Sequence, residues 1–217
     1  MRSQRSMRIT PYRVADLFVG EAERIPVNVH VIDHPDARVL VDTGVEQLHP
    51  AIADMDPRIV PLAGREDLDL ASIDLVVCTH LHADHCGGNH LLAGKPIHVQ
   101  AIELEDARWP QGYTIREWVD APGVEYVVVD GEHELLPGVR LLPAPGHSRG
   151  MQVVVVDDER GDRPVVVGGD VAVWFGELDE PTTEGQHRVL GLDPELAWLT
   201  HVDEPWRPSR PAGHDDP

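Results

Sequence analysis

Four side chains that could bind metal ions lie within six residues of one another. They are His80, His82, Asp84 and His85. They follow the apolar run 75–78, which we expect to form a strand that ends at the edge of a sheet. Imidazole and carboxylate groups suit zinc, and also iron or manganese. The alternative is a solvated histidine-rich loop, since the chain has 13 histidines in 217 residues.

Four ligands on so short a loop fit two ions better than one. In this arrangement His80 and His82 bind the first ion. Asp84 and His85 bind the second ion. Gly87 and Gly88 follow at once, where glycine lets the backbone turn tightly and start a helix.

The pattern His-x-His-x-Asp-His resembles the signature of the metallo-β-lactamase superfamily. The resemblance runs from about Val27 to about Trp206 and implies an α+β fold, a four-layer αββα sandwich. In such a sandwich the metal site lies at one edge of the two sheets. The same resemblance implies two Zn²⁺ ions, although other divalent metals are compatible with these ligands.

Four further motifs of that family can be found in the sequence, each at the end of an apolar run. They contain Asp42, His147, Asp170 and His201. The resemblance implies that His147 completes the ligand set of the first ion and that His201 completes the ligand set of the second. It also implies that Asp170 bridges the two ions. It implies that Asp42 supports the metal loop without binding metal.

Each of these motifs also has a simpler interpretation. Asp42 and Asp170 could stand in plain turns, and His147 could be a surface histidine. For the last ligand, His187 and His214 compete with His201. We prefer His201 because it ends the apolar stretch 196–199.

The chemistry implied is hydrolysis. Two divalent ions lower the pKa of a bridging water, and the resulting hydroxide attacks a carbonyl carbon. Asp84 and Asp170 are the candidates for catalytic proton transfer. This chemistry needs no Ser-His-Asp nucleophile arrangement.

Within the superfamily the sequence is most similar to the N-acyl homoserine lactonases, which act in quorum quenching. The similar stretches include 80–89, 96–100 and 192–197. The expected substrate is therefore a small ester or lactone of the acyl-homoserine lactone kind. One position departs from the pattern: those lactonases carry a tyrosine three residues after the bridging Asp, and this chain has Val173.

Two other activities use related ligand sets. The first is a thioesterase of the hydroxyacylglutathione hydrolase type, whose helical C-terminal domain we do not expect in the short segment 202–217. The second is a mononuclear iron dioxygenase on the same fold, which uses only part of the ligand set. A β-lactamase fits the expected compartment less well.

Aromatic side chains in loops between the metal motifs are candidates for an apolar substrate pocket. They are Trp109, Tyr113, Trp118, Trp174 and Phe175. The alternative for Trp109 and Trp118 is that they anchor a surface insertion. An exposed aromatic patch would also suit a homodimer.

The composition of the chain narrows the range of expected binding partners. The formal net charge is −20, which argues against nucleic acid and anionic membranes. No run approaches the roughly 18 to 20 apolar residues of a membrane span, and no signal peptide is recognisable. Two cysteines make no disulfide framework. We expect a cytoplasmic protein that forms one domain over residues 1–217, with flexible ends at 1–6 and about 208–217.

Short β-branched runs separated by turn residues predict a fold with more strands than helices. The expected strands are 27–32, 38–41, 74–78, 96–99, 125–129, 139–142, 152–156 and 164–167. The expected helices are 46–55, 88–93, 101–109 and 186–190.

Overall fold

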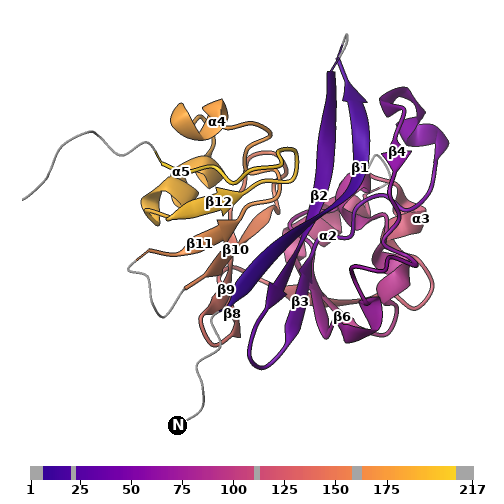
Figure 1. The fold of residues 1–217 in the computed structure, drawn as a ribbon, viewed down its shortest axis with the longest axis horizontal. Helices are drawn as coiled ribbons and strands as arrows, with labels where there is room; N and C mark the ends of the chain where they lie inside the picture. Colours follow the sequence, from indigo (N-terminus) through magenta and orange to yellow (C-terminus); the bar gives the residue numbers. More distant parts are fainter. Residues whose placement is uncertain (1–6, 21–22, 110–112, 158–162, 209–217) are drawn as a thin grey trace, which may run out of the picture.

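Two β-sheets pack face to face in the computed structural model, which describes residues 7–20, 23–109, 113–157 and 163–208 (Figure 1). The first sheet has the strand order β4-β1-β2-β3-β5-β6-β7. Its strands are β1 (Arg8–Val19), β2 (Glu23–Asp33), β3 (Arg38–Val41), β4 (Arg58–Ile59), β5 (Leu75–Val77), β6 (Pro96–Gln100) and β7 (Glu125–Val129). The long antiparallel pair β1–β2 extends beyond the rest of this sheet (Figure 1).

The second sheet has the order β12-β11-β10-β9-β8. Its strands are β8 (His133–Leu136), β9 (Val139–Pro143), β10 (Gln152–Val156), β11 (Val165–Val167) and β12 (Leu196–Trp198). Every residue of β10 is buried, which explains its four consecutive valines. A central strand covered on both faces needs apolar side chains on both.

Helices cover the outer face of each sheet. On the first sheet lie η1 (Pro50–Met55), η2 (Leu70–Ser72), α1 (Ala83–Cys86), η3 (Asn89–Leu92), α2 (Ala101–Ala107) and α3 (Arg116–Val119). On the second lie α4 (Gly176–Asp179) and α5 (Glu184–Gly191). A capping box between Thr183 and Gln186 fixes the start of α5. The predicted α+β sandwich with helices outside two sheets is confirmed.

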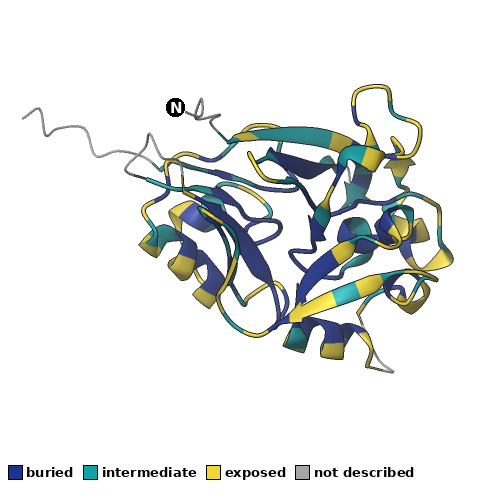
Figure 2. Cartoon of the chain, turned by 90° about the horizontal axis from the view of Figure 1, so that it is seen from below, coloured by how far each residue is buried: buried dark blue, intermediate teal, exposed yellow. Residues whose placement is uncertain are grey.

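A third apolar cluster joins the inner faces of the two sheets. Ile32 and Val41 come from the first sheet, and Leu141 and Val154 come from the second. All four are at most 1% exposed. Figure 2 shows the buried strands at the centre of the molecule, with the exposed residues on the helices and loops around them and on the edge strand β7. The sandwich is therefore held together by alternate apolar residues of both sheets.

Parallel pairing brings functional loops to one edge. In the first sheet β3 is parallel to β5, and in the second β11 is parallel to β12. The two sheets meet at this edge through backbone hydrogen bonds. Gln152 N donates to Thr79 O over 2.8 Å, and Asn28 N donates to Thr200 O over 2.9 Å. The loops that follow β3, β5, β11 and β12 are therefore neighbours in space.

Several predicted elements differ from the structure. The helix expected at 46–55 forms only the 3-10 turn η1, which begins at Pro50 after the His49 side chain accepts from Ala51 N. The helix expected at 88–93 is also a 3-10 turn, η3. Strand β1 was not expected, because its polar residues and Pro11 mask the alternation. Residues 1–6 and 209–217, where we expected flexible ends, lie outside the described residues.

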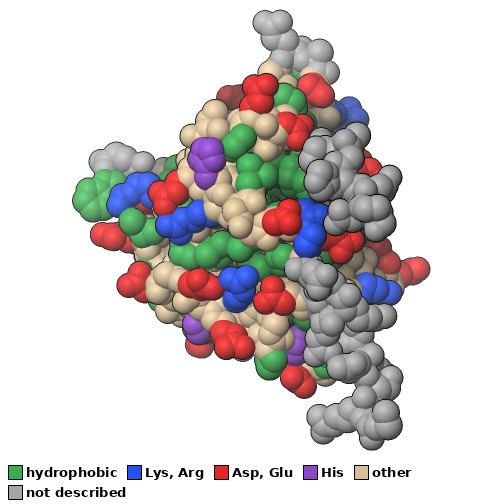
Figure 3. Space-filling view, turned by 90° about the vertical axis from the view of Figure 1, so that its left-hand side faces the viewer, with side chains coloured by type: hydrophobic (Ala, Val, Ile, Leu, Met, Phe, Trp, Pro, Cys, Tyr) green, Lys and Arg blue, Asp and Glu red, His purple; other side chains and the backbone are tan. Residues whose placement is uncertain are grey.

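Among the residues that the structure describes, no helix has the length and apolar character needed to cross a bilayer. Figure 3 shows acidic side chains spread over one face of the molecule, with basic side chains lying among them. This surface matches the acidic composition.

Replacing Leu141 by Ala is expected to lower the free energy of unfolding by about 2–5 kcal/mol, because it leaves a cavity between the sheets. Leu141 is fully buried, whereas Leu48 is 73% exposed. Leu48→Ala is the control and should change stability by no more than about 0.5 kcal/mol. Urea denaturation measures both, and equal losses would contradict the assignment of Leu141 to the core.

Candidate metal centre

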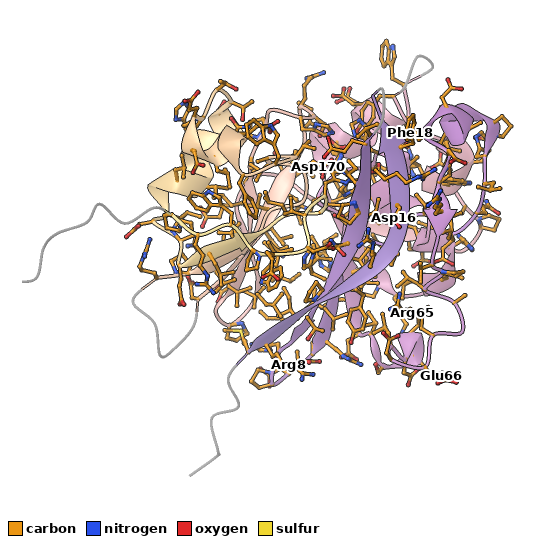
Figure 4. The ribbon with its side chains drawn as sticks, turned by 45° about the horizontal axis from the view of Figure 1, so that its top comes forward. Arg8, Asp16, Phe18, Arg65, Glu66 and Asp170 are labelled. Carbon is orange, nitrogen blue, oxygen red and sulfur yellow. The ribbon has the colours of Figure 1, made fainter. Side chains whose placement is uncertain are left out.

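The seven predicted ligands converge at the edge where the two sheets meet. His80 and His82 lie in the loop after β5, and Asp84 and His85 lie in α1. His147 lies in the β9–β10 connection, Asp170 follows β11 and His201 follows β12. Asp170 lies at the junction of the two sheets in Figure 4. The structure thus brings together residues that are up to 121 positions apart in the sequence.

Three histidines form the first group. His80 Nε2 and His147 Nε2 each lie 2.9 Å from His82 Nδ1. One ring nitrogen facing two others is poorly explained by hydrogen bonding alone. Tetrahedral zinc with nitrogen ligands at about 2.0–2.1 Å would hold neighbouring ligands about 3.3 Å apart. The three nitrogens are therefore arranged as donors around a common point.

The second group consists of Asp84, His85 and His201. His201 Nε2 lies 3.5 Å from Asp84 Oδ2, and His85 Nε2 lies 3.7 Å from the same oxygen. Each ring is held from behind: His201 Nδ1 lies 2.8 Å from Pro26 O, and His85 Nδ1 lies 2.8 Å from Asp42 Oδ2. Both rings therefore point Nε2 toward the carboxylates.

Asp170 touches both groups. Its Oδ2 lies 3.5 Å from His147 Nε2 and 3.1 Å from His201 Nε2. Its Oδ1 lies 3.3 Å from His85 Nε2. Asp170 is 4% exposed, and its Oδ1 has no hydrogen-bond partner, as is true of His85 Nε2. Buried polar atoms without partners are costly, so both atoms are suited to binding a cation.

Asp42 connects the strand that carries it to the metal loop. It accepts hydrogen bonds from Thr79 N and from the Thr79 hydroxyl, both over 2.7 Å. The same carboxylate faces His85 Nδ1. Asp42 is 2% exposed and has a φ of 61°, a left-handed conformation in which aspartate is more common than most residues. Its predicted support of the metal loop stays a prediction, although the contacts are those that such a role needs.

The electrostatics differ between the two groups. Burial and the neighbouring His85 hold the pKa of His80 well below its usual value. Burial and the neighbouring His147 lower the pKa of His82 to about 4. Both imidazoles are thus neutral near pH 7, which is the form that binds metal.

At His85, burial also disfavours the charged ring. The carboxylates of Asp170, Asp84 and Asp42 outweigh it and raise the pKa of His85 well above its usual value. Burial opposes a charge on Asp170 too, but His85 and His201 hold the pKa of Asp170 well below its usual range. Carboxylates that favour a proton on His85 also favour a divalent cation at the same place.

The predicted pocket residues are placed in different environments. Tyr113 packs edge-on against His82, with ring centroids 4.8 Å apart. Trp109 and Trp174 are each 61% exposed. Phe175 is half-buried against the core of the second sheet, whereas Trp118 is 4% exposed and belongs to the core of the first. Of the five, Tyr113 has a direct contact with the candidate metal centre.

The competing histidines lie elsewhere. His187 is exposed on α5, and His214 lies outside the described residues. Glu103 was missed by sequence analysis, although it is fully buried and accepts a hydrogen bond from Leu81 N in the metal loop over 2.8 Å. In the sequence it cannot be told from its acidic neighbours Glu105 and Asp106.

Comparison with known proteins identifies the family of the chain. The sequence profile of the metallo-beta-lactamase superfamily matches residues 22–173. The chain belongs to the metallo-β-lactamase superfamily. It is 30% identical to the N-acyl homoserine lactonase of Bacillus cereus over 198 residues, 83% of this chain and 76% of that protein. It is 26% identical to an N-acyl homoserine lactonase of Rhizobium johnstonii over 191 residues, 76% of this chain and 72% of that protein.

A solved structure has the same fold. It is an N-acyl homoserine lactone hydrolase with the product N-hexanoyl-L-homoserine bound at the catalytic metal centre. The TM-score is 0.71 at 23% sequence identity, over 90% of this chain and 92% of that chain. Three predictions are thus confirmed: the superfamily, the sandwich fold and the class of metal-dependent hydrolases.

Close packing at Gly169 gives a stability test. An added Cβ there would lie 2.4 Å from Thr79 Oγ1, and the residue has a φ of +54°. Gly169→Ala is therefore expected to cost more than the roughly 1 kcal/mol of left-handed strain alone, because Thr79 would also be displaced. Gly64 has a φ of +77° with nothing within 4 Å of its Cβ position.

Gly64→Ala is thus the matched control, with strain but no clash. Urea denaturation of both variants measures the difference in the free energy of unfolding. Equal losses would show that the approach of Gly169 to Thr79 contributes nothing.

Proposed function

We propose that the chain is a dinuclear zinc hydrolase that opens a lactone ring, with an acyl-homoserine lactone as the substrate type. The observation that carries the proposal is the shared carboxylate: Asp170 contacts histidines of both donor groups. A carboxylate in this position suits two ions close together. The similarity to N-acyl homoserine lactonases over 83% of the chain supports the substrate class.

The donor set fits zinc. Nitrogen and carboxylate oxygen donors are typical of catalytic zinc sites, and the two partnerless atoms, His85 Nε2 and Asp170 Oδ1, face the same point. In the proposal His80, His82 and His147 hold the first ion. Asp84, His85 and His201 hold the second, and Asp170 is common to both.

When bound, the two ions supply an activated water and a Lewis acid for the carbonyl oxygen. The protein's own residues arrange and complete the reaction. Asp42 and the Pro26 carbonyl orient the rings of His85 and His201. The side chain of Asp84 is 15% exposed, so it can exchange a proton with substrate, whereas that of Asp170 is 4% exposed. We assign Asp84 to proton transfer toward the leaving alkoxide.

The substrate side differs from the lactonase pattern. Val173 cannot hold a lactone oxygen, because it has no polar side-chain group. Tyr113 is 39% exposed and lies against His82, so it can contact the substrate beside the first ion. Exposed Trp174, next to Val173 in the chain, is a candidate contact for an acyl chain.

A substrate panel on zinc-loaded protein tests the activity. We expect hydrolysis of N-acyl homoserine lactones, weaker hydrolysis of simple lactones, and little of S-acyl glutathione thioesters or β-lactams. Metal analysis should give two zinc ions per chain, and a chelator should remove the activity. Thioester hydrolysis above lactone hydrolysis would favour the thioesterase, and a single bound iron would favour the dioxygenase.

Asp84→Ala is expected to lower kcat/KM for the lactone by about 100- to 10,000-fold, the usual range for a lost acid–base group. Asp54 is an exposed aspartate in η1, so Asp54→Ala serves as the matched control. Steady-state kinetics on both variants measure the effect. Unchanged activity of the Asp84 variant would overturn the proposed mechanism.

A further inference from the structure

Glu103 is a buried carboxylate that the proposed reaction does not use. It lies in the first turn of α2 and is fully buried. Leu81 N donates to Glu103 Oε1 over 2.8 Å, and the Ser148 hydroxyl donates to Oε2 over 2.7 Å. The Tyr113 hydroxyl also donates to Oε1. Three donors from three different segments thus meet on one side chain.

Each donor is next to a histidine of the first group. Leu81 stands between His80 and His82 in the chain, and Ser148 follows His147. Tyr113 packs its ring against the ring of His82. Glu103 therefore reaches the surroundings of all three histidines through hydrogen bonds to their neighbours.

We propose that Glu103 is a positioning residue that fixes the geometry of the three-histidine site. The proposal rests on the proposed metal centre. Hydrogen bonds to a carboxylate are stronger than those between neutral groups, and burial excludes water that would compete with them. Movement of any one of the three segments would leave a buried polar group unpaired, which is costly.

The backbone of α2 is built to come this close. An added Cβ at Gly150 would lie 2.2 Å from Glu103 N, so the loop that carries His147 touches the helix directly. A second link between the same segments is the ion pair of Arg149 and Asp106, 2.9 Å apart. The first turn of α2 and the His147 loop thus form one packed unit.

Glu103 has a counterpart on the other side of the centre. Asp42 accepts from Thr79 and faces His85, a histidine of the second group. Asp42 also reaches His80 indirectly, because the Thr79 hydroxyl lies 3.2 Å from His80 Nδ1, whereas Glu103 is linked to the first group alone. Loss of Glu103 should weaken the three-histidine site selectively and spare the site of Asp84, His85 and His201.

The test measures metal binding, so it is independent of the substrate. Metal-free protein is titrated with zinc against a chromophoric chelator, and with cobalt(II), whose visible d–d bands report coordination geometry. Glu103→Leu keeps a similar volume and removes both carboxylate oxygens, which accept the three hydrogen bonds. We expect one of the two zinc affinities to fall about 10- to 100-fold and the cobalt bands of that site to change.

Glu103→Gln keeps one acceptor oxygen and should restore part of the affinity. The matched control is Glu105→Leu, since Glu105 is exposed on the same helix. It should bind both ions like the unaltered protein. Ser148→Ala removes one donor, leaves the carboxylate in place, and should weaken the same site by a smaller factor.

The outcomes separate the two proposals. Unaltered protein that binds no zinc would overturn the proposed function. If it binds two ions and the Glu103 variants bind both with unchanged affinity and cobalt spectrum, the role of Glu103 is overturned, even where their thermal stability falls. Equal weakening of both metal sites would also overturn the role of Glu103, because a general loss of structure lowers the affinity of both sites alike. If Glu103→Leu does not fold, unchanged zinc binding by Ser148→Ala overturns the role.

Discussion

The contact on which the candidate centre depends is the one between Asp42 and the segment after β5. The Asp42 carboxylate accepts hydrogen bonds from both the backbone amide and the hydroxyl of Thr79, and it also faces His85. A single side chain thus joins the end of β3 to the end of β5 and orients a ring of the metal loop. Asp42 makes these contacts from a left-handed backbone conformation, with a φ of 61°. Asparagine in its place would keep the shape but lose the stronger, charge-assisted acceptor.

Two sets of buried hydrogen bonds link this region to the second sheet. Gln152, at the start of β10, donates from its amide to Thr79 O and from its side chain to Cys78 O. Asn28 on β2 donates to Thr200 O beside His201. The ligands come from both sheets, so their distances depend on how the sheets are aligned. These buried hydrogen bonds set that alignment, because apolar packing between sheets tolerates small sliding and hydrogen bonds do not.

The sequence predicted the part of the site that is local. His80, His82, Asp84 and His85 follow a short apolar strand, and such a strand end places its loop whatever the rest of the fold does. The strands at 38–41, 125–129 and 152–156 agree with the structure because each contains a run of valines or other residues that favour strands. That Asp170 and His201 join the metal loop was predicted from family resemblance alone. Nothing local in a Gly-Gly-Asp or Thr-His sequence specifies which residues lie near it in the fold.

Prediction from the sequence was wrong or incomplete where tertiary contacts determine whether a side chain is buried. Glu103 and Glu105 look alike in a short acidic helix, but Glu103 faces Gly150 and the metal loop and is buried, whereas Glu105 is exposed. Trp118 was a candidate for the pocket and lies in the core, because α3 turns it toward Gly87. Aromatic residues in loops serve both roles, and their spacing in the chain does not distinguish them.

Charge gives a last physical reason to expect a neutral substrate. The protein carries a formal net charge of −20, so an anion approaching the centre is repelled at long range, whereas a lactone ring is not. Metal ions held at the proposed centre would reverse the field only close to Asp84 and Asp170. If the protein opens lactones as proposed, the reaction would create a carboxylate inside that local field, and the negative charge of the whole protein would then repel this product. The acidic surface thus disfavours an anionic thioester at entry and favours release of the acid formed from a neutral ester.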